Sequence, residues 1–296
     1  MASGFVIGIT GPQIVVRVGD QDLSCGLRGR LKKDRKQVTS LVVVGDNVEV
    51  TLLPDGTGMI DAVAPRRTEL ARPGFAHRAR VVAANLDQLV VVQATHKPRF
   101  NRHLVERFLT IAAGGGLRGV VVVNKADLEE EAVVESWVQP LRAAGVLVFL
   151  TNAKTGQGVE ELRVALTGKL SAMVGQSGVG KSSLLNALDP SLSIRTAEIS
   201  DATNKGKHTT TASKLYPLAG GGFLVDTPGI RELALFEGDP GSVAFVFPEI
   251  TEAAAGCRFR GCSHSHEPGC AVKAKVAAGE IEEDRLQHFV KLSAGG

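Results

Sequence analysis

The chain reads Gly175-Gln176-Ser177-Gly178-Val179-Gly180-Lys181-Ser182 between two apolar segments. A strand is predicted before this loop at Leu170–Val174, and the helix predicted after it carries Leu184, Leu185 and Leu188. The loop matches G-x-x-x-x-G-K-[ST], whose glycines let backbone N–H groups surround phosphates at the start of a helix. This stretch therefore predicts an α/β domain that binds a nucleoside triphosphate, with ATP and GTP both open.

Two side chains at the end of the loop have expected roles in binding the phosphates and the metal ion. We expect Lys181 to reach the β- and γ-phosphates as a catalytic group, and the Ser182 hydroxyl to bind Mg²⁺. Ser183 follows directly and is included among the predicted nucleotide-binding residues.

Two further loops predict that the base is guanine. Asn124-Lys125-Ala126-Asp127 follows an apolar run at Val120–Val123 and matches N-K-x-D. The Asp127 carboxylate can accept hydrogen bonds from guanine N1–H and the 2-amino group, whereas adenine offers no donor there. The second loop follows Val146–Leu150 and supplies three predicted nucleotide-binding residues, Asn152, Ala153 and Lys154.

A fourth motif, Phe223-Leu224-Val225-Asp226-Thr227-Pro228-Gly229, is an apolar strand that ends in an acid. Such a strand suits an Asp226 that holds Mg²⁺ and a Gly229 whose N–H meets the γ-phosphate. Together the four motifs predict a GTPase. The guanine motifs precede the phosphate loop, which is the reverse of the usual order, so the domain is predicted to be circularly permuted.

The central motifs lie in a region of alternating strand and helix patterns. Valine-rich runs such as Leu89–Ala94 alternate with amphipathic segments, for example a helix capped by Asn101 and helices at 129–144 and 159–166. This alternation indicates a buried parallel sheet in an α/β domain.

The N-terminal region reads differently. Residues 1–63 hold short β-rich runs at Phe5–Thr10, Ile14–Val18, Leu41–Val44 and Asn47–Leu53, which indicate a small all-β barrel or sandwich. Residues 65–74 show no periodicity and are predicted to be a linker. A basic run with one acid lies on a barrel loop, and its candidate RNA-binding residues are Arg28, Arg30, Lys32, Lys33, Arg35 and Lys36. An ordinary solvated loop is the alternative.

The cysteines indicate a metal site near the C-terminus. Cys257, Cys262 and Cys270 fall within a stretch of fourteen residues, a spacing typical of metal ligation in a cytosolic chain. Cys25 stands apart and is predicted to be an inert thiol. A helix is predicted over Glu280–Leu292.

Composition limits the class of protein. The chain has 296 residues, 44% of them hydrophobic and 22% charged, with a net charge of +3. No apolar stretch approaches the ~18 residues of a membrane span, and the N-terminus shows no secretory signal. We therefore expect a cytoplasmic, multidomain protein without membrane partners, and a monomer.

The motifs together resemble the small-ribosomal-subunit-dependent GTPases called RsgA or YjeQ, over essentially the whole chain. The resemblance implies an OB-fold-like β-barrel over residues 1–64, a circularly permuted GTPase domain over 65–245 and a zinc-binding domain with helices over 246–296. It also implies one structural Zn²⁺, Mg²⁺ with GTP, and docking on the small ribosomal subunit and its rRNA. The implied function is a GTPase that assists or checks late maturation of that subunit.

The resemblance also assigns residues. The family pattern C-x4-C-x-H-x5-C is supplied by Cys257, Cys262, His264 and Cys270, with His266 as a competing ligand. Gly206-Lys207-His208-Thr209-Thr210-Thr211 resembles the first switch, in which one threonine, taken as Thr210, binds Mg²⁺. Ile230 occupies the position of the water-orienting glutamine of many GTPases, so the family-implied catalytic candidate is His208, with a bystander loop histidine as the alternative. Asn152 stands where the guanine-contact loop of the family more often has serine.

Two rival functions are kept. A non-ribosomal switch whose flanking domains bind a protein would show stimulation that is indifferent to RNA. A P-loop kinase or ATPase is disfavoured by Asn124–Asp127, and a nucleotide competition assay separates it from a GTPase.

Overall fold

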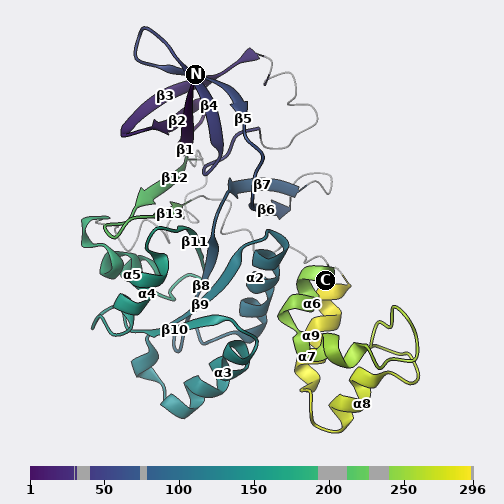
Figure 1. Cartoon of the computed structure of the whole chain (residues 1–296). Helices are drawn as coiled ribbons and strands as arrows, with labels where there is room; N and C mark the ends of the chain where they lie inside the picture. The colour runs from purple at the N-terminus through teal and green to yellow at the C-terminus, as the bar shows by residue number, and fades with distance from the viewer. Residues whose placement is uncertain (30, 32–40, 74–78, 193–211, 227–239, 295–296) are drawn as a thin grey trace, which may run out of the picture.

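The structure is a computed structural model that describes residues 1–29, 31, 41–73, 79–192, 212–226 and 240–294 (Figure 1). Among these residues no helix is both long enough and apolar enough to cross a membrane.

The N-terminal strands close into a five-stranded barrel. The strands are β1 (Ala2–Thr10), β2 (Gln13–Val18), β3 (Gln21–Leu27), β4 (Asn47–Leu52) and β5 (Gly58–Val63). They pair in the order β1-β2-β3-β5-β4, and β4 returns to pair with β1. Val48 and Val50 of β4 alternate with exposed neighbours and point into the barrel core, as expected for a strand with one buried face. The predicted OB-fold-like barrel is confirmed.

Two details of the barrel differ from the sequence prediction. The predicted strand at Leu41–Val44 is wrong, because among these residues Val44 alone forms an isolated bridge, to Ala83. Val44 is fully buried, and its carbonyl accepts from the Ala84 N–H at 3.0 Å. Its side chain therefore packs outside the barrel, in the main core. The other two strands, β3 and β5, were not predicted, and Cys25 of β3 is buried against Gly58 of β5. Burial raises the pKa of this thiol, in line with an inert cysteine.

The central sheet carries the predicted α/β pattern. Its strands are β8 (Gln88–Ala94), β9 (Arg118–Asn124), β10 (Leu147–Thr151), β11 (Leu170–Val174), β12 (Ala212–Pro217) and β13 (Phe223–Asp226). Their order is β10-β9-β8-β11-β13-β12, with β12 antiparallel and the other five parallel. β12 also pairs with β1 of the barrel, so the two sheets are continuous (Figure 1).

Helices cover both faces of this sheet. They are α2 (Arg102–Gly114) and α3 (Glu131–Ala143) on one face, and α4 (Val159–Leu166) and α5 (Lys181–Leu188) on the other. Val91 of β8 belongs to the core of the first pair, whereas its neighbour Val92 belongs to the core of the second. Successive side chains of a strand point to opposite faces, so a strand buried on both reads as a continuous apolar run.

The predicted linker is wrong in part. Its second half forms β6 (Glu69–Pro73), which pairs antiparallel with β7 (Ala79–Ala84) as a separate two-stranded sheet. Leu70 is fully buried in the main core, and Arg66 binds the buried Asp46 carboxylate with 2.8 Å between Nε and Oδ1. A strand this short has too few residues to show a period, so local sequence did not reveal it.

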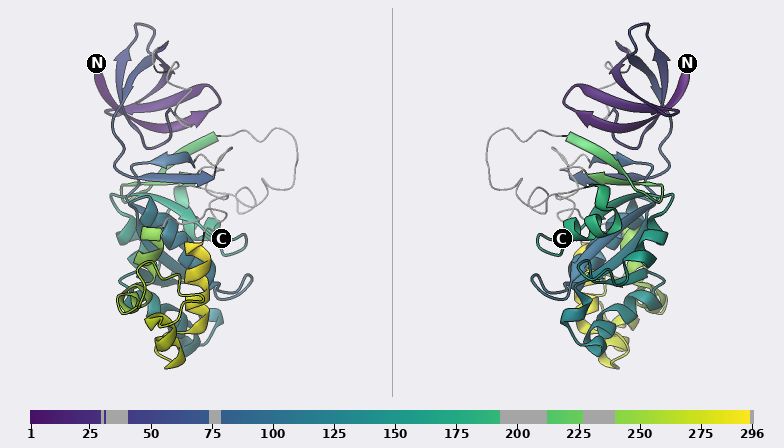
Figure 2. Two further views of the ribbon diagram at one scale, coloured as in Figure 1. Left: turned by 90° about the vertical axis from the view of Figure 1, so that its right-hand side faces the viewer. Right: turned by 90° about the vertical axis from the view of Figure 1, so that its left-hand side faces the viewer.

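The C-terminal region is helical. It holds α6 (Pro240–Val246), α7 (Pro248–Ala254), α8 (Ala271–Ala277) and α9 (Glu283–Ser293). These helices lie beside the central sheet on the side of α2, away from the barrel (Figures 1 and 2). The predicted domain boundary at 245/246 falls inside α6, and the three domain limits remain predictions.

Candidate functional site

The phosphate loop joins β11 to α5 in the predicted strand–loop–helix arrangement. Its glycines are required by close contacts. A Cβ at Gly175 would lie 2.2 Å from the Val92 carbonyl oxygen, and one at Gly180 would lie 2.3 Å from Asn124 Nδ2. Both also have positive φ angles, 149° and 94°. Only glycine therefore lets the loop lie this close to the neighbouring strand ends.

Lys181 spans the beginning of the loop. Its Nζ donates to the carbonyl oxygens of Gly175 and Gln176, both at 2.7 Å. The ammonium is thereby held at the mouth of the loop, where the motif requires a cation for the phosphates. Ser182 follows on the first turn of α5 and is buried.

Asn124 connects the phosphate loop to both guanine loops. Its Nδ2 donates to the Val179 carbonyl oxygen at 2.9 Å, and its Oδ1 accepts from the Ala153 N–H at 3.1 Å and the Thr151 hydroxyl at 3.3 Å. The Asn124 side chain is buried, so its amide and the groups bonded to it satisfy one another in place of water. The base and phosphate parts of the site are therefore built around one amide.

Lys125 fixes a second connection. Its Nζ donates to three carbonyl oxygens, of His96 at 2.9 Å, Lys97 at 3.0 Å and Gly178 at 2.9 Å. Burial and the nearby Lys154 ammonium lower the pKa of Lys125. The lysine thus binds the loop between β8 and α2 to the phosphate loop. His96 and Lys97 take part through backbone atoms, which no sequence motif could reveal.

The other residues predicted to bind guanine lie in the loops that follow β9 and β10. Asp127 is exposed in a short 3₁₀ turn, Ala126–Leu128. Asn152 is buried, and its Oδ1 accepts from the N–H groups of Lys154 at 2.9 Å and Thr155 at 3.2 Å, which shapes the second loop. The N–H of Ala153, another predicted nucleotide-binding residue, donates to Asn124 Oδ1.

Two of the predicted magnesium ligands, Ser182 and Asp226, belong to elements that the structure describes. β13 pairs in parallel with β11, so Asp226 ends its strand at the edge from which the phosphate loop leaves. This position and the hydroxyl of Ser182 fit a hard cation that prefers oxygen ligands. His208, Thr210, Gly229 and Ile230 lie outside the described residues, and so do Arg30, Lys32, Lys33, Arg35 and Lys36 of the basic run. Arg28 is described and forms an ion pair with the buried Asp61 of the barrel, at 2.5 Å between Nε and Oδ1.

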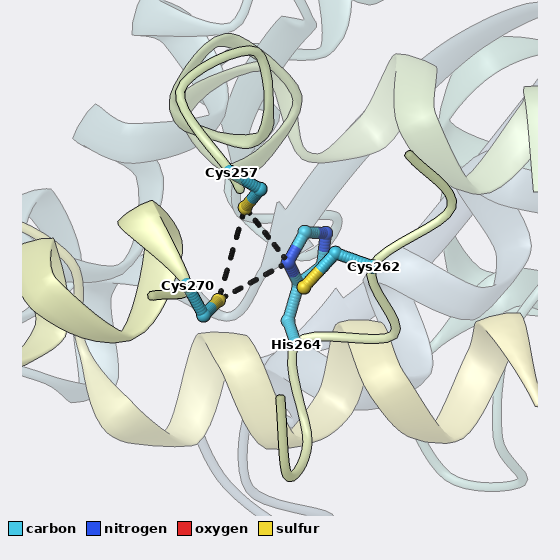
Figure 3. A group of neighbouring side chains, drawn as sticks. All are labelled: Cys257, Cys262, His264 and Cys270. Atoms are coloured by element: carbon cyan, nitrogen blue, oxygen red, sulfur yellow. Dashed lines mark hydrogen bonds between the residues drawn. The ribbon is translucent and has the colours of Figure 1, made fainter. Parts of the chain in front are cut away.

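The four predicted metal ligands gather near the C-terminus. The ligand atoms of Cys257, Cys262, His264 and Cys270 all lie within 4.8 Å of one another. Figure 3 shows the four side chains gathered together. Three of the separations are 3.6 Å from Cys257 Sγ to His264 Nδ1, 3.4 Å from His264 Nδ1 to Cys270 Sγ, and 3.9 Å between the two sulfurs. Ligands at zinc–sulfur and zinc–nitrogen bond lengths around a tetrahedral ion are spaced by about 3.5–3.8 Å. The group therefore fits one Zn²⁺.

Local structure selects His264 over His266. His264 has a positive φ of 60° and is buried, with Nδ1 turned toward the cysteines, whereas His266 is exposed and its Nδ1 lies 2.9 Å from the Ser265 hydroxyl. Burial lowers the pKa of His264, which favours the neutral imidazole that binds metal.

The thiols differ in their surroundings. Burial tends to raise the pKa of Cys257, but hydrogen bonds from the N–H groups of Val272 and Ala271 and from the neighbouring thiols together lower it. Burial and the neighbouring thiols raise the pKa of Cys262 to about 11. Zinc ligation would release the proton of that thiol, because the thiolate is the ligand.

One buried cluster was missed by the sequence analysis. Glu106 of α2 is fully buried. Its Oε1 lies 2.5 Å from Arg285 Nη1, and its Oε2 lies 2.5 Å from His288 Nδ1, both on α9. The only sequence signal is a charged residue on an otherwise apolar helix face, which does not identify its partners.

Comparisons with known proteins agree with this arrangement. The model of the RsgA GTPase family matches residues 63–236. A protein of Gemmatimonas aurantiaca named small ribosomal subunit biogenesis GTPase RsgA is 43% identical, over 98% of this chain and 96% of its own length. Its namesake from Chlorobaculum tepidum is 40% identical over the same shares.

Two solved structures are similar along the whole chain. The crystal structure of YjeQ from Thermotoga maritima has a TM-score of 0.77 and 34% identity, covering 98% of this chain and 96% of that one. The crystal structure of YloQ, described as a circularly permuted GTPase, has a TM-score of 0.73 and 30% identity, covering 98% and 93%.

Proposed function

Because the chain belongs to the RsgA GTPase family, we propose that it binds the small ribosomal subunit and assists or checks its late maturation. As a member of that family it is a GTP hydrolase. In the proposed role, the subunit stimulates hydrolysis of GTP to GDP and phosphate.

One observation carries the nucleotide part of the proposal. Asn124 bonds at once to the phosphate loop, through Val179, and to the second guanine loop, through Ala153. A site that reads the base and holds the phosphates needs these loops at a fixed separation, and one buried amide supplies it. Asp127 would then read guanine from the exposed turn beside it.

The hydrolytic step follows from the expected residue roles. Lys181 would bind the β- and γ-phosphates, and Ser182, Asp226 and Thr210 would hold Mg²⁺, whose charge stabilises the phosphoryl oxygens. Water attacks the γ-phosphorus, forming a new P–O bond as the bond to the GDP oxygen breaks. His208 is the proposed group that orients this water and takes its proton, since the side chain of Ile230 has no polar atom.

Two regions support docking on RNA. The basic run from Arg28 to Lys36 would contact rRNA phosphates from the barrel, while the zinc-binding region would contribute a second surface. We propose a cytoplasmic, monomeric protein with one structural Zn²⁺ held by the Cys257 cluster.

The test is GTP turnover with and without purified small subunits. We expect clear stimulation by the subunit and none by the large subunit. Lys181→Ala should abolish turnover in both conditions, whereas the exposed Lys169→Ala, at the opposite edge of the sheet, should not. A stimulation ratio of one would remove the ribosomal role and leave the GTPase. Stimulation by a protein partner that is indifferent to RNA would favour a non-ribosomal switch.

A further inference from the structure

The loop between the metal ligands presents an exposed aromatic ring. We define the zinc loop as residues 258–269, between Cys257 and Cys270. Its first three residues, Arg258, Phe259 and Arg260, are all exposed, and Phe259 has 45% of its surface accessible. Few large apolar side chains are exposed among the described residues, so an exposed ring between two arginines is a candidate binding feature.

The ring is held in place by its neighbours. The Arg258 N–H donates to the Gly269 carbonyl oxygen at 3.2 Å, and the Arg258 stem lies so close to Gly269 that a Cβ there would be 3.2 Å from Arg258 Cβ. The Arg258 guanidinium lies over the Phe259 ring, 5.5 Å from its centroid. Because Cys257 and Cys262 flank this tripeptide as metal ligands, zinc would fix both ends of the segment.

The segment that holds the ring carries an excess of positive charge. Residues 257–280 contain four basic side chains, Arg258, Arg260, Lys273 and Lys275, against two acidic ones, Glu267 and Glu280. Glu280 pairs with Lys275 at 3.2 Å, so these two charges offset each other, and Glu267 keeps its charge while it accepts from the Ser263 N–H at 2.7 Å. The surface beside Phe259 therefore favours an anionic partner.

The chemistry points to RNA rather than to a protein. Aromatic rings and arginines also form protein hot spots, but the excess of basic residues in this segment suits a polyanion such as RNA. Unpaired RNA bases stack on aromatic side chains and on guanidinium planes, while neighbouring arginines bind the phosphates.

We propose that Phe259 is a stacking platform for an unpaired base of the RNA on which the protein docks, with Arg258 and Arg260 binding the adjoining phosphates. This inference rests on the proposed ribosomal function and adds to it a residue-level contact. The ring supplies affinity that depends little on salt, and the arginines supply the part that does.

The experiment measures binding of the full-length, zinc-loaded protein to purified small subunits over a range of salt concentrations. Phe259→Leu should weaken binding by between about 5-fold and 150-fold, because it removes the stacking of one base. Phe259→Trp should retain the affinity. Phe245→Leu is the matched control, since Phe245 is also exposed, at 70%, but lies on α6 outside the zinc loop, and it should bind as the wild type does.

Two further measurements separate stacking from a general loss of structure. The double variant Arg258→Gln, Arg260→Gln should reduce the slope of log affinity against log salt by about 0.7–0.9 for each phosphate that is no longer bound, and Phe259→Leu should leave that slope unchanged. In a Trp137→Phe background, Phe259→Trp supplies the single indole of the chain, and its fluorescence should be quenched when subunits bind.

The outcomes distinguish the two proposals. If the wild-type protein binds subunits and zinc-loaded Phe259→Leu binds them with the same affinity, this inference alone is overturned. The same holds if the fluorescence of the indole introduced by Phe259→Trp does not change when subunits bind. Absence of subunit binding by the wild-type protein would overturn the proposed function together with it.

Discussion

Glu106 of α2 and His288 of α9 are hydrogen bonded in the interior of the protein, with 2.5 Å between Oε2 and Nδ1. Arg285 binds the other carboxylate oxygen of Glu106, also at 2.5 Å, and its guanidinium lies 4.3 Å from the ring centroid of Phe247. Glu106 and His288 are separated by 182 positions in sequence. One buried carboxylate thus joins the nucleotide-binding region to the helices that follow it.

Replacing Glu106 by glutamine should destabilise the protein strongly. The substitution removes the buried one of the two carboxylates that bind Arg285 and leaves only the half-exposed Glu249 to balance its charge. Breaking a buried pair costs up to ~3–5 kcal/mol. Urea unfolding measures this change in stability. Glu135→Gln is the matched control, because Glu135 pairs with Arg142 on the surface of α3 and should cost about 1 kcal/mol or less.

The same carboxylate predicts a dependence on pH. Burial alone would raise the pKa of Glu106, but the hydrogen bond from His288 and the charge of Arg285 hold it below the ordinary value of 4.5. A lowered pKa in the folded state means that the stabilisation is complete above the unfolded-state value and is lost as the pH falls through the folded pKa. The stability difference between wild type and Glu106→Gln should therefore shrink below pH 4.5, and a constant difference down to acid unfolding would contradict this account.

Asn124→Asp should weaken binding of both GTP and GDP. The substitution places a carboxylate oxygen against the Val179 carbonyl oxygen, in place of the amide donor at 2.9 Å. Leaving a buried polar group without its partner costs enough to lower affinity by roughly 5- to 150-fold. Fluorescent nucleotide titration measures it. Equal affinities would mean that the loops hold their separation without this amide.

Asp127→Asn should change the base that is preferred. The exposed turn of Asp127 leaves its carboxylate available to guanine N1–H and the 2-amino group, whereas asparagine suits xanthine, which presents a carbonyl in place of the amine. Competition between GTP and XTP measures the preference. Glu130→Gln, three residues further along the chain, should retain the wild-type preference, and an unchanged preference in Asp127→Asn would refute the assignment.

The purified protein should contain about one zinc ion per chain. His264→Ala should lower the zinc content and unfold the region around α8, because metal ligation contributes folding free energy there. Elemental analysis and limited proteolysis test this pair of effects. His266→Ala is the control, since its ring lies outside the ligand group and should leave the metal content unchanged.

His208→Ala should leave GTP affinity nearly unchanged and remove most of the subunit-stimulated rate. The reason is chemical, because Ile230 cannot orient water and His208 is the only histidine between the phosphate loop and Asp226. Single-turnover hydrolysis with saturating subunits measures the rate. A variant that keeps the full stimulated rate would make His208 a bystander.

Several features could be predicted from the sequence because their causes are local. The phosphate loop needs glycines at positions where the backbone itself approaches a neighbour, as at Gly175 and Gly180. The Asn101 cap accepts from the Leu104 N–H at 3.0 Å, and a cap depends on residues within one turn. The metal ligands likewise lie within fourteen residues, so their spacing alone was informative.

Other features depend on residues distant in sequence and could not be predicted. Val44 is buried in the main core, where it bridges to Ala83 of β7, and Leu70 lies in β6, a strand too short to show a period. Nothing in the sequence around Glu106 names Arg285 or His288 as its partners.

The sequence by itself determined the chemistry of the protein: a phosphate loop, a guanine motif, three thiols with an imidazole, and strands that are apolar throughout. These depend on residue type at short spacing, which is written directly in the chain. Only the tertiary structure decided how the parts are joined. In the folded protein Asn124 links the base and phosphate loops, and Lys125 donates to three backbone carbonyls. Glu106 pairs with His288 of α9. Such contacts follow from the three-dimensional path of the backbone, because a buried polar group bonds to whichever partner packing brings within reach.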